Sequence, residues 1–204
     1  MKKIILAGMA LTVLALACGE EEGVTPNVDY RVVPTSPRAV LVNVETAFNR
    51  RDINLLKAML SPNFVFYFDP DDVGQNPPGG SKYVIPETWP YAEFTGAVTK
   101  LYKNAYSVSL TIPTTNVGEP GANETIYNAE NINIKLLVMV DEINGYIANA
   151  GYCNFEFERY ESPGGKKFWR LTKWWDNTNW SRDANPGVAP TSLGKILALY
   201  KLPF

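Results

Sequence analysis

Apolar residues recur at helical spacing in the stretch that follows residue 36. Positions 40, 44, 47 and 48 form one apolar stripe, and the Ser36-Pro37 pair before it suits the start of a helix. The pattern predicts a helix over residues 37–51. Asp52 then suits the cap of a second short helix, which a Ser-Pro pair brings to an end.

Alternating apolar and polar positions dominate the rest of the chain and predict a sheet. The predicted strands cover residues 64–68, 106–112, 132–140, 146–159 and 166–176. A third helix is predicted over 86–104, with Pro90 in its first turns and Trp89 at its entrance. Asn144-Gly145 is typical of a type I′ hairpin and predicts a tight turn between the third and fourth strands.

This order of elements predicts an α+β fold. We expect a curved, mostly antiparallel sheet that forms a cone, with three helices from the first half of the chain covering its concave face. The folded domain is expected to span residues 37–178. The tail, residues 179–204, predicts one short amphipathic helix capped by Ser192.

The first residues of the chain predict export. Residues 1–17 have the pattern of a signal peptide, two lysines and then an apolar run too short to span a bilayer. Cys18 stands where that run ends, and the small residues before it resemble a bacterial lipobox. The resemblance implies cleavage before Cys18 and lipid attachment to it; an ordinary secretory signal with an incidental cysteine is the alternative. Residues 18–36 then form a membrane tether, and Gly19, in place of a retaining Asp, indicates the periplasmic face of the outer membrane.

Composition narrows the chemistry. The 204-residue chain contains no histidine, which excludes a Ser-His-Asp or Cys-His device and the usual zinc sites. Its formal net charge of −2, without a basic stripe, makes it a poor nucleic-acid binder. Cys153 lies in an alternating strand pattern and is expected to be a buried, inert thiol. Asp69, Asp71 and Asp72 resemble the opening of a calcium loop, but Gly80 stands where that loop needs Glu. We therefore expect neither a metal nor a cofactor.

Two stretches carry a family resemblance, AFNRRDINLLKAMLSPNFVFYF near the start and FWRLTKWWD near the end. Together they resemble the nuclear transport factor 2-like superfamily, the cone-shaped, cystatin-like fold shared with SnoaL-like proteins. The chain is especially similar to uncharacterised bacterial lipoproteins of that group, which end in a short helix like that at 194–199. The resemblance covers residues 38–178. The superfamily includes isomerases, dehydratases, hydrolases, ligand carriers and assembly domains, so no single activity is implied. The lack of histidine excludes its His-Asp dehydratases.

A few acidic and aromatic residues are candidates for lining a pocket in the cone. Asp176 ends the last predicted strand after two tryptophans, and Asp69 ends the first. A carboxyl beside buried aromatics is a candidate base with a raised pKa, and capping of a turn is the alternative. The aromatic candidates, for which core packing is the alternative, are Tyr67, Trp89, Tyr152, Trp169 and Trp174. No catalytic residue carries over from the family by motif.

Two functions of different classes remain open. The favoured one is a non-catalytic, lipid-anchored envelope module that holds a small apolar ligand in the cone or presents its sheet to an envelope protein, because no chemically matched pair of residues stands out. The alternative is an isomerase- or hydrolase-type enzyme, with an Asp base and a Tyr facing one cavity. The expected partners are the membrane, through Cys18, and one of those ligands; the family resemblance adds a homodimer as a third option.

Overall fold

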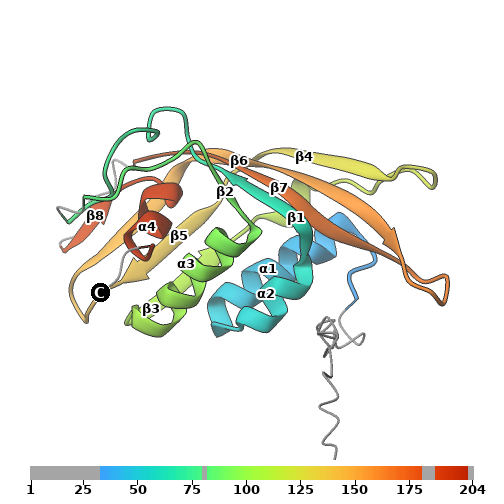
Figure 1. Ribbon diagram of the computed structural model, residues 1–204, viewed down its shortest axis with the longest axis horizontal. Coiled ribbons are helices and arrows are strands. Elements are labelled where there is room, and N and C mark those ends of the chain that lie inside the picture. The colour runs from blue at the N-terminus through green and yellow to red at the C-terminus, as the bar shows by residue number, and fades with distance from the viewer. Residues whose placement is uncertain (1–32, 80–81, 181–186, 202–204) are drawn as a thin grey trace, which may run out of the picture.

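The computed structural model describes residues 33–79, 82–180 and 187–201. The predicted signal peptide, Cys18 and most of the predicted tether lie outside these residues. In the described part of the chain, helices pack against one face of a strongly curved sheet (Figure 1). The predicted α+β fold, with helices covering the concave face of a cone-shaped sheet, is confirmed.

The elements follow one another as the chain order predicts, with three additional strands, β2, β4 and β8. The helices are α1 (Pro37–Arg50), α2 (Ile53–Met59), α3 (Tyr91–Asn104) and α4 (Leu193–Leu199), with a 3₁₀ turn η2 (Thr114–Asn116). The strands are β1 (Leu60–Tyr67), β2 (Thr88–Pro90), β3 (Ser107–Thr111), β4 (Ile126–Ile132), β5 (Lys135–Met139), β6 (Gly145–Glu161), β7 (Lys167–Trp180) and β8 (Val188–Pro190).

Side-chain caps fix the starts of the first two helices at the predicted residues. The Ser36 hydroxyl accepts the N–H of Ala39 at 3.2 Å. The Asp52 carboxylate accepts the N–H groups of Asn54 and Leu55 at 3.0 and 2.9 Å. These bonds satisfy backbone donors that a helix leaves unpaired in its first turn.

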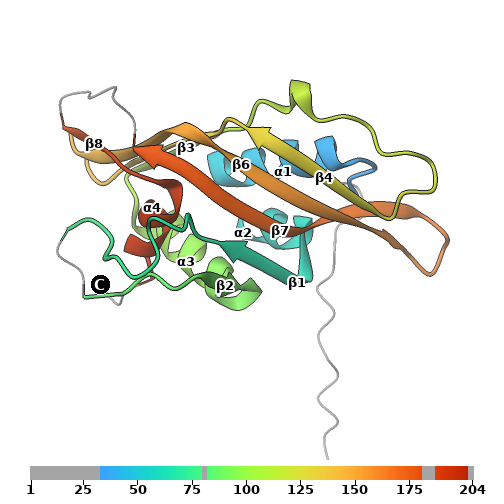
Figure 2. The ribbon, with the colours of Figure 1, turned by 90° about the horizontal axis from the view of Figure 1, so that it is seen from above.

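The described strands form one sheet in the order β2-β1-β7-β6-β5-β3, and β4 and β8 also pair with β6. Most pairs are antiparallel, whereas β1 runs parallel to β7 and β8 runs parallel to β6. The long β6–β7 hairpin turns at residues 162–165, where the N–H of Ser162 donates to the carbonyl of Lys166 at 2.9 Å. Figure 2 looks onto the outer face of the sheet, the face turned away from α1, α2 and α3.

The third helix begins later than predicted, at Tyr91. The residues before it form β2, which pairs antiparallel with β1 and places Trp89 opposite Phe66. The reason is Pro90, whose ring drives the preceding residue out of the helical region, so that the chain is still extended at Trp89. Trp89, predicted at the helix entrance, is instead fully buried.

The strand predicted over 132–140 is the shorter β5, and β4 precedes it in a stretch where no strand was predicted. β4 pairs with the second half of β6 and β5 pairs with the first half. Asn131, whose φ of 57° lies in the left-handed region, interrupts the regular ladder before β5 begins. Alternation of apolar residues continues across the break, which is why the pattern alone did not indicate it.

The hairpin predicted at Asn144-Gly145 is present, because β5 and β6 pair antiparallel, but its two-residue turn is wrong. Gly145 already belongs to β6, where it pairs with Met139, so the connection comprises residues 140–144. The Asp141 carboxylate closes this loop by accepting the N–H groups of Ile143 and Asn144 at 2.8 and 2.7 Å. A Cβ at residue 145 would lie 2.6 Å from a backbone oxygen, so the glycine serves close strand approach.

Candidate functional site

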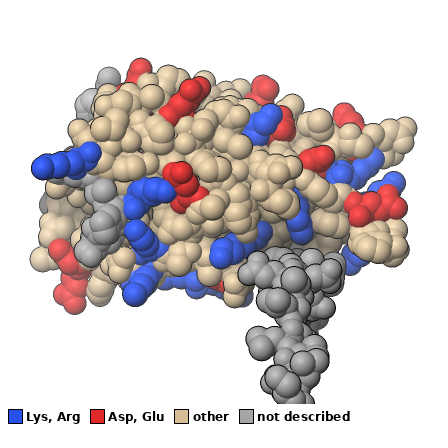
Figure 3. Space-filling view, viewed as in Figure 1, with Lys and Arg blue, Asp and Glu red and all other residues tan. Residues whose placement is uncertain are grey.

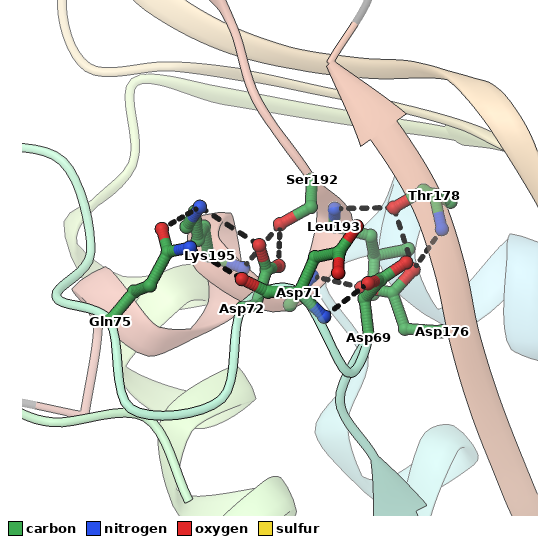
Figure 4. Close-up of polar contacts among 10 residues, drawn as sticks. Asp69, Asp71, Asp72, Gln75, Asp176, Thr178, Ser192, Leu193 and Lys195 are labelled. Atoms are coloured by element: carbon green, nitrogen blue, oxygen red, sulfur yellow. Dashed lines mark hydrogen bonds and ion pairs between the residues drawn. The ribbon is translucent and has the colours of Figure 1, made fainter. Parts of the chain in front are cut away.

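Asp176 lies inside β7, not at the strand end that the sequence predicts, because β7 continues to Trp180. Its side chain points into the molecule and is 1% exposed. One carboxylate oxygen accepts the N–H and the hydroxyl of Thr178, at 3.0 and 2.6 Å. The other oxygen accepts the backbone N–H of Gly194 in α4 at 2.6 Å (Figure 4). Asp176 therefore holds the start of a helix that comes later in the chain.

The first turn of α4 is fully capped by this cluster. The N–H of Leu193 donates to the Thr178 hydroxyl at 2.8 Å, and the N–H of Lys195 donates to the Ser192 hydroxyl at 3.1 Å. With the Gly194–Asp176 bond, the first three backbone donors of α4 each have a partner. The predicted Ser192 cap is confirmed.

A second acid fixes the same helix from the loop after β1. Asp72, 5% exposed, accepts a hydrogen bond from the Ser192 hydroxyl and forms an ion pair with Lys195 at 2.8 Å. Lys195 also donates to the Gln75 side-chain oxygen at 2.8 Å. The loop and α4 are thereby joined by a partly buried network (Figure 4).

Burial raises the pKa of Asp176 to about 7, and the charge of Asp72 adds to the rise. The hydrogen bonds from Thr178 and Gly194 act in the opposite direction, because they favour the ionised carboxylate. A general base needs an oxygen that can approach a substrate proton. Both oxygens of Asp176 instead face donors of the protein itself, and none of these donors is a tyrosine.

Asp69 sits in the loop that follows β1 and is 9% exposed. Its carboxylate accepts the N–H of Asp71 at 2.8 Å, and its carbonyl accepts the N–H of Asp72 at 2.9 Å. Burial raises its pKa. These bonds are those of a side-chain-capped turn, the alternative that the sequence left open.

Aromatic side chains fill the space between the sheet and the helices. Trp174 and Phe66 contact at 5.8 Å between ring centroids, and Phe94 lies 5.4 Å from Phe66. A side chain without accessible surface cannot line a ligand-sized cavity. The aromatic side chains with zero exposure are Phe48, Phe66, Trp89, Phe94, Phe155, Phe157 and Trp174.

The candidate pocket residues therefore do not come together. Trp89 and Trp174 belong to the packed core, and Trp169 is 3% exposed beside the guanidinium of Arg159. Tyr67 lies on the outer face, where its ring stacks on Trp175 at 5.2 Å. Tyr152 is 39% exposed.

An open groove on the outer face was not predicted from the sequence. It has a volume of about 390 Å³ and is lined by residues of three strands. Its accessible lining comprises Asn128 and Glu130 of β4, Asn154 and Glu156 of β6, and Trp175 and Asn177 of β7; Phe155 borders it with a fully buried side chain. Polar residues at alternate strand positions indicate only a solvated face, and the pairing of β4 with β6 that forms the groove is not encoded locally.

Cys153 is a free, fully buried thiol, as predicted. Burial raises its pKa well above the ordinary value, and the neighbouring Asp176 adds to the rise. Such a thiol is a poor nucleophile. Within residues 33–79, 82–180 and 187–201, no three side chains of the ligating types lie close enough together to hold a metal ion.

No described helix combines the length and apolar character needed to cross a membrane. Acidic and basic side chains are scattered between uncharged areas on the face shown in Figure 3.

Comparison with known proteins yields similarity in structure alone. No protein-family profile matches the chain, and no curated protein matches its sequence. A protein of unknown function from Mycobacterium tuberculosis is 11% identical, with 80% of this chain and 82% of that chain covered and a TM-score of 0.45. A hexachlorocyclohexane dehydrochlorinase from Novosphingobium barchaimii is 14% identical, with 76% and 85% covered and a TM-score of 0.45. A conserved protein from Planctomyces limnophilus is 16% identical, with 68% and 89% covered and a TM-score of 0.44.

The order of the elements and the helix-covered, curved sheet are those implied by the resemblance to the nuclear transport factor 2-like superfamily.

Proposed function

We propose that this chain is a non-catalytic binding module of the bacterial cell envelope, which binds through the outer face of its sheet. The observation that carries the proposal is the closed interior. Aromatic side chains occupy the cone, and α4, capped by Asp176 and Thr178, packs into the same core. The enzyme alternative needs an Asp and a Tyr that face one cavity, and the contacts of Asp176 and Asp69 do not favour it.

The outer face of the sheet has an accessible groove and accessible aromatic rings, whereas the interior is filled by side chains. It carries the groove over β6 and, beside it, the stacked rings of Tyr67 and Trp175. Stacked, half-buried aromatic rings on a surface are common in binding sites because they bury much area at a small cost in conformational entropy. A ligand bound here leaves the core unchanged.

Anchoring is a separate part of the proposal. A lipid on Cys18 places the domain at the membrane surface, on the periplasmic face of the outer membrane, at the end of a tether. Fractionation of cells that express the full chain tests this part. We expect the protein in the membrane pellet and the Cys18→Ser variant in the soluble fraction. A Cys18→Ser variant that still sediments with membranes would contradict lipid anchoring.

Fluorine NMR of the full chain labelled with fluorotryptophan tests the binding face. The chain has five tryptophans, and single Trp→Phe variants assign their signals. Trp174 and Trp89 report the core, whereas Trp175 reports the outer face. We expect members of a library of fatty acids, sterols, peptides and oligosaccharides that bind to move the Trp175 signal. A ligand that moves the Trp89 and Trp174 signals and leaves Trp175 unchanged would place binding in the cone and overturn the proposal.

A further inference from the structure

We propose that the groove over β6 binds a neutral saccharide, with a sugar ring against the indole of Trp175. The inference rests on the proposed function, because it names the ligand class of the same outer face. The groove volume of about 390 Å³ falls in the range of roughly 300–1,000 Å³ found for small-molecule sites.

The aromatic wall is held in place by its neighbours. In the sheet order, β7 lies between β1 and β6. Tyr67 of β1 stacks on Trp175 with an angle of 19° between the rings, so the indole is supported from the β1 side. The ammonium group of Lys173, which is paired with Glu156, also lies over the indole, 5.6 Å from the ring centroid, and Trp175 lines the groove beside them. A pre-positioned ring face suits the C–H face of a sugar, since little conformational freedom is lost on binding.

The polar lining provides both donors and acceptors. Asn154 accepts the N–H of Asn131 at 2.8 Å through its side-chain oxygen, which leaves its NH₂ group for a ligand. The side chains of Asn128 and Asn177 make no hydrogen bond within the described residues. A carboxamide donates and accepts at once, as a pair of neighbouring hydroxyl groups does. The groove therefore matches a polyhydroxylated ring better than an apolar ligand.

The charge of the groove disfavours an anionic ligand, and the pairing of β6 excludes a peptide that binds by strand addition. Glu156 is paired with Lys173 at 3.2 Å, whereas Glu130 has no cation partner among the described residues, so the groove disfavours an anionic ligand. Each edge of β6 is already paired, one with β7 and the other with β4, so an extended peptide cannot add as a strand there. A neutral saccharide meets both conditions.

Titration of the fluorotryptophan-labelled full chain with cellohexaose, maltohexaose and chitotetraose tests the inference. We expect at least one of these neutral probes to move the Trp175 signal saturably at millimolar concentration, with Trp89 and Trp174 unchanged. In calorimetry, Trp175→Ala and Asn154→Ala should each weaken the binding of that probe about tenfold or more. Tyr106→Ala removes an exposed aromatic side chain outside the groove and should leave the affinity unchanged.

Three results would overturn the saccharide assignment. They are no shift of Trp175 with any of the probes, equal loss of affinity in Tyr106→Ala, and tighter binding of an acidic oligosaccharide such as a hyaluronan fragment. A different result would overturn the proposed function itself: ligands that move the NMR signals of Trp89 and Trp174 and leave that of Trp175 unchanged. A peptide that moves Trp175 while the saccharides do not would overturn the assignment and leave the binding face standing.

Discussion

The Asp176 carboxylate accepts the backbone N–H of Gly194 at 2.6 Å, across a buried contact between β7 and α4. The acid that the sequence places first among the catalytic candidates thus serves as a helix cap. The bond joins the predicted tail to the core, since Leu193, Ile196 and Leu197 are buried with it.

Stability should depend on the ionisation of Asp176. Its folded-state pKa of about 7 lies above the ordinary value, so the folded chain holds this proton more tightly than the unfolded chain. The contribution to stability is fully present below about pH 4 and is lost as pH rises through about 7; each unit of pKa difference corresponds to about 1.4 kcal/mol. Urea unfolding from pH 4 to pH 8 measures it.

Asp176→Asn should be destabilised by about 1–3 kcal/mol at pH 5, because an amide NH₂ meets a backbone or hydroxyl donor. The free energy of unfolding of the variant should no longer change with the ionisation of residue 176. The gap in stability between the variant and the native chain should therefore narrow towards pH 8. Asp141→Asn is the control, since hydrogen bonds from Asn144 lower the pKa of this exposed acid and keep it ionised over the range. Parallel pH profiles of Asp176→Asn and the native chain would contradict the assignment.

Gly194→Ala should destabilise the fold although alanine favours helices. A Cβ at this position would lie 2.7 Å from a ring carbon of Phe68 and 2.9 Å from the Asp176 carboxylate. We expect a loss of about 1–3 kcal/mol in the free energy of unfolding, with faster proteolysis near α4. Gly96→Ala in α3 is the matched control, because a Cβ there meets nothing within 4 Å and should stabilise by about 0.5–1 kcal/mol. Stabilisation by both substitutions would show that α4 is not closely packed.

The Asp72–Lys195 pair should be coupled more strongly than a surface ion pair. Asp72 is nearly buried, and removing it leaves the Ser192 hydroxyl without its acceptor. A double-mutant cycle of Asp72→Ala and Lys195→Ala should give about 1–3 kcal/mol of coupling free energy. The more exposed Lys173–Glu156 pair should give about 1 kcal/mol or less in the same experiment. Equal values for the two pairs would rule out a special role for the buried one.

Replacing the neighbouring residues Trp174 and Trp175 by alanine should cost very different amounts of stability. Trp174 is fully buried and contacts Phe66 and Phe155, so Trp174→Ala should cost about 3–5 kcal/mol of stability. Trp175→Ala removes a surface ring with its stacking contact to Tyr67 and its cation–π contact with Lys173, and should cost about 1 kcal/mol. Chemical denaturation of both variants checks this, and similar losses would contradict the assignment of the two faces.

The thiol of Cys153 should report unfolding. It is fully buried with a raised pKa, so a thiol reagent should react only after the core opens. The labelling rate should therefore rise in Gly194→Ala and stay close to the native rate in Gly96→Ala. Rapid labelling of the native chain at neutral pH would disprove the burial.

Local patterns were sufficient for the helices and most strands. Ser36, Asp52 and Ser192 cap the helices that follow them, because a cap is a short-range arrangement that the sequence shows directly. The start of α3 lies later than predicted because Pro90 keeps Trp89 in an extended conformation, a steric effect that the apolar stripe of α3 does not show.

The site depends on long-range contacts that no local pattern contains. Asp176 resembled a strand end because polar residues follow it, and β7 continues through them since Thr178 and Asp176 find partners in α4. The groove likewise requires β4 to lie beside β6. Neither partner lies within the window that a strand pattern covers.

The parallel pairing of β1 with β7 has a consequence for folding kinetics. Leu60 and Leu171, paired in the sheet, are separated by over a hundred residues of chain, and α4 packs onto β7 later still. Such a topology has a high contact order, and closing long loops before their contacts form makes folding slow. β1 can therefore pair with β7 only after most of the chain has become available for folding. Until the segment around residue 194 packs against β7, the fold is incomplete and exposed to proteases and chaperones.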